Sequence, residues 1–217
     1  TRLAEQGVVL ITLNYRLGPW GFLAHPALSA ESSHNSSGNY GLLDKIAALN
    51  WIRDNISAFG GDADNVTIFG QSAGSSSVCA LMASPLSQGL FHKAIGQSAA
   101  CLNPPGRDAN GERRGRALVD AVFAEQATDT LSAEDLRKID NQTLLDAVDA
   151  SGWASQSRIV IDGWVLPESP AQTFSAGRQA NVPVLLGSTA NEGHLLFPVN
   201  EQLLSLIHIS EPTRLSV

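Results

Sequence analysis

Short apolar runs alternate along the chain with longer segments of helical spacing. Three runs have the length and β-branched content of buried strands: VVLITLNY at Val8–Tyr15, VTIFG at Val66–Gly70 and VPVLLG at Val182–Gly187. The segments between them place apolar residues at steps of three and four positions, which is typical of helices. Strands that alternate with helices predict an α/β fold with a mostly parallel sheet.

The clearest helical pattern lies in Gly41–Phe59. Its apolar positions recur on one face, which we expect to pack against the sheet: Leu42, Leu43, Ile46, Leu49, Ile52 and Ile56. The pair Gly60-Gly61 is expected to end this helix. Weaker helical patterns occupy three later segments, and the last two are expected to be surface helices outside the sheet: Glu112–Ala127, Ala133–Ile139 and Asn141–Ala150.

The stretch VTIFGQSAG at Val66–Gly74 joins an apolar run to a helix-compatible segment. This pattern is typical of a nucleophile elbow, a sharp turn from a strand into a helix that exposes one serine hydroxyl at the strand end. A Cβ atom at Gly70 or Gly74 is expected to crowd such a turn. The pentapeptide GQSAG by itself is a weak signal, but the strand before it and the helix after it make Ser72 the candidate nucleophile.

Composition narrows the classes of function. The chain has 217 residues, 43% of them hydrophobic, which suffices for one sizeable core, and no change in composition marks a second domain. A net charge of −7 argues against nucleic acid or an anionic membrane as a partner, and no apolar run is long enough to span a bilayer. The two cysteines, Cys79 and Cys101, are expected to be buried thiols. No cofactor or metal site is predicted.

Further blocks follow one another in an order and spacing that resemble one family. They are VVLITLNYRLGPWGFL at Val8–Leu23, GNYGLLDKIAALNWIRDNISAFGGD at Gly38–Asp62, FHKAIGQSA at Phe91–Ala99, IDGWVLPESP at Ile161–Pro170 and VPVLLGSTANEG at Val182–Gly193. Together with the elbow, they resemble the carboxylesterase type B family, which includes carboxylesterases, cholinesterases and bacterial para-nitrobenzyl esterases. The resemblance implies a partial α/β-hydrolase fold, a mostly parallel central sheet with flanking helices. It also implies a serine hydrolase that cleaves small-molecule carboxylic esters through an acyl-enzyme.

The resemblance assigns roles to individual residues near the elbow. Glu192 lies in STANEG, directly after the predicted strand at Val182–Gly187, and matches the family's triad acid. The backbone N–H of Ala73 matches one donor of the oxyanion hole. Ser98, in GQSA, is either a serine that supports the triad or a simple hydroxyl at a strand end.

Three other polar residues have an expected role that is not catalytic. Arg16 and Asp44 are implied by the resemblance to form a structural ion pair, which we expect to be buried. Gln71 precedes the nucleophile where many relatives carry glutamate. Because an amide brings no negative charge, strong selectivity for cationic substrates is not expected.

None of the five histidines is convincing as the general base: His25, His34, His92, His194 and His208. The first two precede the nucleophile, the third begins a strand block, and the fourth lies two residues from the candidate acid. The last lies in LSLIHISEPTR at Leu204–Arg214, which departs from the family pattern and resembles the translation of an adapter used in DNA sequencing. The family's histidine follows the acid at a long interval, so we expect it outside this sequence.

The sequence therefore predicts a partial carboxylesterase type B domain at residues 1–203 and a non-native tail at residues 204–217, with the domain truncated at both ends. The family's upstream His-Gly-Gly-Gly-type loop, which supplies most of the oxyanion hole, is not in the sequence. We expect the chain alone to be nearly inactive and its intact parent to be an esterase. The alternative is a non-catalytic, cholinesterase-like interaction module, which the retained Ser72 disfavours.

Overall fold

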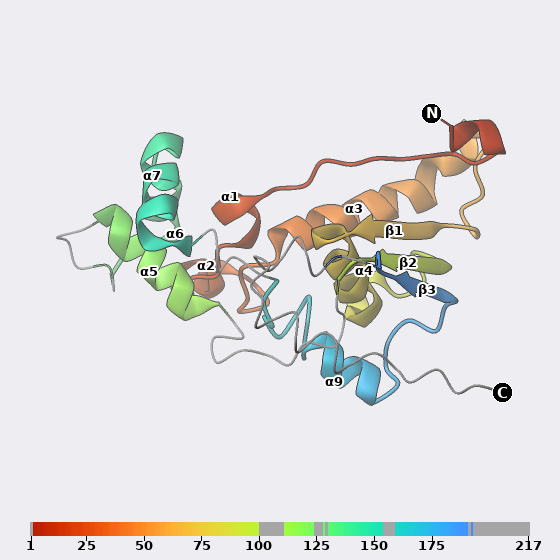
Figure 1. Cartoon of the computed structure of the whole chain (residues 1–217). Coiled ribbons are helices and arrows are strands. Elements are labelled where there is room, and N and C mark those ends of the chain that lie inside the picture. Colours follow the sequence, from red (N-terminus) through yellow and green to blue (C-terminus); the bar gives the residue numbers. More distant parts are fainter. Residues whose placement is uncertain are drawn as a thin grey trace, which may run out of the picture.

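The computed structural model describes residues 2–99, 111–123, 128, 130–153, 159–190 and 192. In these residues, helices pack against part of a small parallel sheet (Figure 1). The elements in chain order are η1 (Ala4–Gln6), α1 (Gly18–Phe22), α2 (Pro26–Glu31), α3 (Tyr40–Asn55), η2 (Ile56–Phe59), β1 (Thr67–Gln71), α4 (Ala73–Ala83), η3 (Pro85–Ser87), β2 (Lys93–Gln97), α5 (Glu112–Phe123), α6 (Ala133–Arg137), α7 (Asn141–Ser151), α9 (Pro170–Ser175) and β3 (Val184–Gly187).

The sheet of the described residues has three strands in the order β1-β2-β3, and both neighbouring pairs are parallel. Strands β1 and β3 arise from two of the predicted apolar runs, and β2 lies inside the block FHKAIGQSA. The register places Gln71 of β1 opposite Gln97 of β2, which in turn lies opposite Gly187 of β3. The carboxyl ends of all three strands therefore meet at one edge of the sheet.

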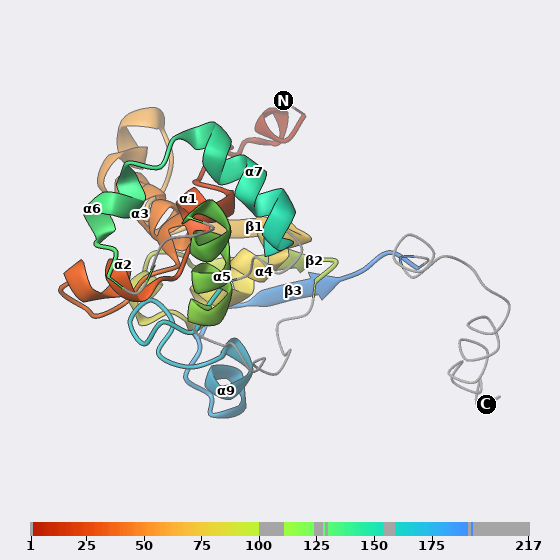
Figure 2. The same cartoon turned by 90° about the vertical axis from the view of Figure 1, so that its left-hand side faces the viewer.

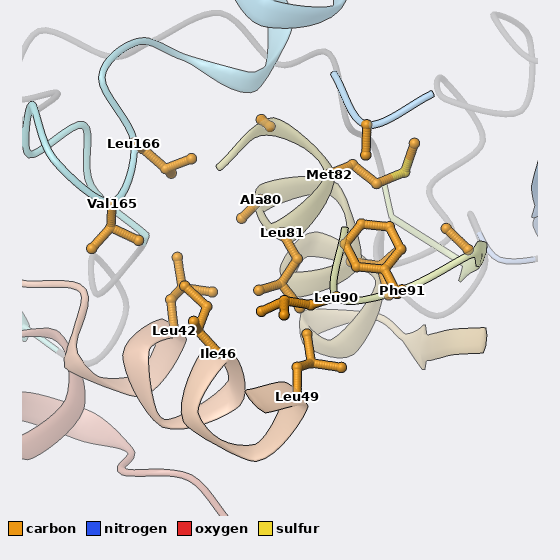
Figure 3. Close-up of a cluster of buried hydrophobic side chains, with 14 of the residues drawn as sticks. Leu42, Ile46, Leu49, Ala80, Leu81, Met82, Leu90, Phe91, Val165 and Leu166 are labelled. Atoms are coloured by element: carbon orange, nitrogen blue, oxygen red, sulfur yellow. The ribbon is translucent and has the colours of Figure 1, made fainter. Parts of the chain in front are cut away.

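The main core lies between α3, α4 and the sheet. The predicted helix at Gly41–Phe59 is confirmed as α3 and η2, and Gly60 follows it with a positive φ of 78°. Figure 3 shows Leu42, Ile46 and Leu49 of α3 pointing toward Leu81 of α4 and toward Leu90. This packing fixes α4, the helix that follows the elbow, against β1 and β2.

A second apolar cluster joins α5 and α7 to the segment that follows α1. Its buried members are Leu23, Leu118, Leu144, Ala147, Val148 and Trp153. The three helices α5, α6 and α7 lie together at one end of the molecule (Figure 1 and Figure 2). The predicted helices at Ala133–Ile139 and Asn141–Ala150 are thus confirmed outside the sheet, and the described part of Glu112–Ala127 is helical as α5.

The segment Val8–Tyr15 does not form the predicted strand. It is extended, but no strand lies beside it in the described part of the chain, and a strand is held by hydrogen bonds to its neighbour. Several of its apolar side chains are exposed: Val8, Val9, Ile11 and Leu13. The apolar pattern correctly indicated extended backbone. A strand also needs a hydrogen-bonded neighbouring strand, and the sequence pattern of one segment does not show whether that neighbour is present.

Two expectations about side chains need correction. Arg16 and Asp44 do form the implied ion pair, with Nη2 2.7 Å from Oδ1, but the pair is not buried, because the side chains are 52% and 25% exposed. Cys79 is buried as expected, yet it is disulfide-bonded rather than a free thiol. Its partner lies outside the described residues.

Every helix among the described residues is too short or too polar to cross a membrane.

Candidate active site

Ser72 occupies a sharp turn between β1 and α4. Its backbone has φ 54° and ψ −116°, a conformation that non-glycine residues rarely adopt and that stores strain. The turn brings the helix very close to the strand, since a Cβ atom on Gly70 would lie 2.4 Å from the carbonyl carbon of Gly74. The sharp strand-to-helix turn predicted from the sequence is therefore present, and Gly70 is required by the approach of α4.

The expectation for Gly74 was wrong. A Cβ atom built there meets no atom of the described residues within 4 Å outside its own helix and chain neighbours. The crowding is one-sided, because the Cβ of residue 70 would point at the backbone of residue 74 and not the reverse. Only the first glycine of the pentapeptide is required by packing.

Hydrogen bonds hold the Ser72 backbone while its side chain stays accessible. The Ser72 N–H donates to the Gln97 carbonyl of β2 at 2.8 Å, and the Ser72 carbonyl accepts from Ser76 N–H at 2.9 Å. The residue is exposed, and within the described part of the chain its hydroxyl forms no hydrogen bond. The N–H of Ala73 belongs to the first turn of α4, where backbone donors have no partner within the helix. An exposed hydroxyl thus stands beside backbone donors at the positive end of a helix dipole.

Glu192 lies just beyond β3, at the same sheet edge. Its carboxylate accepts two hydrogen bonds: one from the Ser98 hydroxyl, and one from Thr189 N–H at 3.0 Å. Ser98 follows β2 directly, has a positive φ of 58°, and donates its own N–H to the Gly187 carbonyl of β3 at 2.8 Å. The sequence left the role of Ser98 open between triad support and a simple strand-end hydroxyl, and the structure brings its hydroxyl to the candidate acid.

These two donors favour the ionised form of the carboxylate. The Ser98 hydroxyl, and then the Thr189 N–H, hold the pKa of Glu192 below its ordinary value, against a smaller opposing effect of burial. A carboxylate that stays negative can orient and stabilise a neighbouring imidazolium. Thr189 was missed from the sequence because a backbone donor carries no residue-type signal.

The described histidines have other partners. His25 is buried and accepts a hydrogen bond from Ala27 N–H. His34 stacks on Trp164 with ring centroids 3.8 Å apart, and His92 accepts a hydrogen bond from Val66 N–H. The other two histidines of the sequence, His194 and His208, lie outside the described residues, as does the predicted tail at 204–217. Among the described residues, no three His, Cys, Asp or Glu side chains are grouped as metal ligands would be.

Several known proteins are similar in sequence to this chain. The profile of the Carboxylesterase family matches residues 1–211. The fumonisin B1 esterase of Sphingopyxis macrogoltabida is 42% identical over 194 residues, which make up 88% of this chain and 35% of that protein. The para-nitrobenzyl esterase of Bacillus subtilis (strain 168) is 42% identical over 200 residues, 91% of this chain and 40% of that protein.

A solved structure agrees with the sequence matches. A Geobacillus stearothermophilus carboxylesterase superposes with a TM-score of 0.73 at 33% identity, covering 92% of this chain and 44% of that one. The chain has a parallel sheet, a strained serine turn between a strand and a helix, and this structural match. Together they identify an α/β-hydrolase fold, which is present here in part. The chain belongs to the carboxylesterase family. It spans only about two-fifths of the length of the relatives named here.

Proposed function

We propose that this chain carries the nucleophile and the acid of a serine esterase that hydrolyses small-molecule carboxylic esters. The observation that supports the proposal most is that Ser72 and Glu192 follow the parallel strands β1 and β3, which lie on either side of β2, at the same edge of the sheet. Membership of the carboxylesterase family supports the same reaction class. No observation on the described residues favours the non-catalytic interaction module.

The proposed reaction begins when Ser72 Oγ attacks the ester carbonyl. A general base takes the hydroxyl proton, and the negative charge on the carbonyl oxygen is stabilised by N–H donors that include Ala73. The base then protonates the departing alcohol, which leaves an acyl group on Ser72. Water, deprotonated by the same base, hydrolyses this acyl-enzyme and restores the serine. Glu192, held negative by Ser98 and Thr189, orients the base and stabilises its cation.

The base and most of the oxyanion hole are proposed to come from parts of the parent protein outside this sequence. We propose that this base is a histidine. It is proposed to lie outside this sequence, because the described histidines contact residues other than Ser72. Loss of one oxyanion donor typically lowers the rate by about 100- to 1000-fold. The 217-residue chain alone is therefore proposed to be nearly inactive. Residues 204–217 are separately proposed to be a non-native tail.

The test uses the parent protein at its full genomic length. Ser72→Ala is expected to abolish hydrolysis of a short p-nitrophenyl ester and labelling by a fluorophosphonate. Ser76→Ala is the matched control, because Ser76 lies one helical turn further along α4 and is expected to retain both. Unchanged turnover in Ser72→Ala would contradict the proposed nucleophile, and a wild-type protein that is not labelled would favour the interaction module.

A further inference from the structure

The segment Leu23–His25 passes between two closely approaching backbones. A Cβ atom on Gly115 of α5 would lie 1.7 Å from the carbonyl oxygen of Ala24, and a Cβ atom on Gly38 would lie 2.8 Å from the Ala24 side chain. Leu23 also packs into the apolar cluster of α5 and α7. The segment is therefore the contact by which α5 and α7 join the loop before α3.

His25, the next residue after Ala24, is buried beside this contact. The residue is only 3% exposed, and its Nδ1 accepts a hydrogen bond from Ala27 N–H at 3.2 Å, which caps the start of α2. Its backbone is fixed by Ser37, whose hydroxyl accepts from His25 N–H at 3.0 Å and donates to the His25 carbonyl at 3.3 Å. An Nδ1 atom that accepts a hydrogen bond carries no proton, so this geometry fits only the neutral ring.

Among the described residues, the charges that act on this ring come from α5. Arg116 opposes a positive charge on His25, and Asp120 favours one. Burial has the largest effect, followed by Arg116, and together they hold the pKa of His25 below its ordinary value of 6.5 despite Asp120. The loop on the other side contributes the neutral hydroxyl of Ser37.

We propose that His25 is an acid-sensitive lock, which holds α5 and α7 against the loop before α3 while its ring is neutral and releases them when the ring is protonated. Protonation replaces the Nδ1 acceptor by a donor that faces Ala27 N–H, and it places a positive charge in a buried site near Arg116. Opening the contact between Leu23–His25 and Gly115 lets water reach the charged ring. This inference does not depend on the proposed esterase reaction.

The sign of the pH dependence follows from the two states of the lock. An exposed histidine in the released state takes up a proton near pH 6.5, whereas the locked state takes one up only at lower pH. The released state therefore binds more protons as the pH falls below 6.5, and acid favours release. Between the pKa of the released state and the lower pKa of the locked state, the ratio of locked to released protein is expected to fall by at most about tenfold for each pH unit.

Hydrogen exchange read by mass spectrometry tests the lock in the full-length parent protein. Between pH 7.5 and 5.5, after correction for intrinsic exchange rates, peptides of α5 and α7 should lose protection while those of α3 and α4 keep it. His25→Asn should abolish this loss, because asparagine caps a helix without titrating. His34→Asn is the control, since it removes an exposed histidine and should behave as the wild type.

Two results would overturn the proposal. One is an equal acid-induced loss of protection in His25→Asn and in the wild type. The other comes from the wild type alone, so it holds even if the variant does not fold: nitrogen chemical shifts of the His25 ring that report protonation at pH 6.5 or above. We expect instead a neutral ring with its proton on Nε2 at pH 7 and protonation at lower pH.

Discussion

Lys45 lies in the middle of α3 with its ammonium group buried. The residue is 7% exposed, and its Nζ atom has no hydrogen-bond partner among the described residues. The nearest compensating group is the ring of Tyr15, whose centroid lies 3.1 Å from Nζ, with the Phe22 ring further away at 5.9 Å. Replacing Lys45 with methionine keeps most of the length of the side chain and removes the charge, so we predict that Lys45→Met stabilises the protein at neutral pH.

The structure sets the size of this effect. Burial lowers the pKa of Lys45 from 10.5 to about 8, with the charge of Asp44 opposing the change. That difference corresponds to about 3 kcal/mol of unfavourable free energy for the charged lysine at pH 7. Loss of the cation–π contact with Tyr15 offsets about 0.5–2 kcal/mol of the gain. The free energy of unfolding should therefore rise by about 1–3 kcal/mol in the variant.

The wild-type protein should also become more stable as the pH rises from about 8 to 10.5. In that interval, Lys45 keeps its proton in the unfolded chain and loses it in the folded one, so the unfolded state binds more protons. Urea unfolding of the parent protein at pH 7 and at pH 10 measures both effects. Lys138→Met is the control, because Lys138 is 64% exposed and should change stability little. If Lys45→Met is no more stable than the wild type at pH 7, the buried charge of Lys45 does not destabilise the folded protein as predicted.

Three further predictions concern the elbow and its neighbours. In the parent protein, Gly70→Ala drives a Cβ atom into the backbone of Gly74, so the variant should lose about 1–3 kcal/mol of stability and most of the proposed esterase activity, whereas Gly74→Ala should be tolerated in a thermal melt. Ser75→Ala removes a fully buried hydroxyl that has no hydrogen-bond partner in the described part of the chain, and a gain of about 1 kcal/mol is expected in urea unfolding; a loss would show that the hydroxyl is satisfied. Ser98→Ala removes a donor from Glu192, so the pKa of that carboxyl should rise, and the acid limb of the kcat/KM profile of the parent protein should move to higher pH; an unmoved limb would separate Ser98 from the proposed triad.

Parts of the fold that depend on nearby residues were predictable. The helix over Gly41–Phe59 and its buried face follow from a repeat of three and four residues, and the elbow follows from an apolar run joined to GQSAG. Strands β1 and β3 coincide with apolar runs. In each case the signal lies within one turn or one strand, where spacing alone determines which side chains share a face.

Contacts between distant segments were not predictable in the same way. The strand expected at Val8–Tyr15 needs a hydrogen-bonded neighbour, which the described residues do not place beside it. The bonding state of Cys79 depends on which residue the fold brings to it, and the exposure of the Arg16–Asp44 pair depends on what covers it. Such features are properties of the assembled molecule, so patterns of residue type carry little information about them.

The candidate site also contains one local feature that the sequence predicts and one contact between distant segments that it does not. The sequence alone singled out Ser72, because a strand, a sharp turn and a helix must be contiguous to expose a nucleophile. Only the tertiary structure decided that Ser98 and Thr189 donate to Glu192, since this cluster needs β2 to pair with β3 in a register that aligns Gln97 with Gly187. The local geometry of the chain follows from the order of its residues. The contact between Ser98 and Glu192, which are 94 positions apart, depends on how the whole sheet assembles.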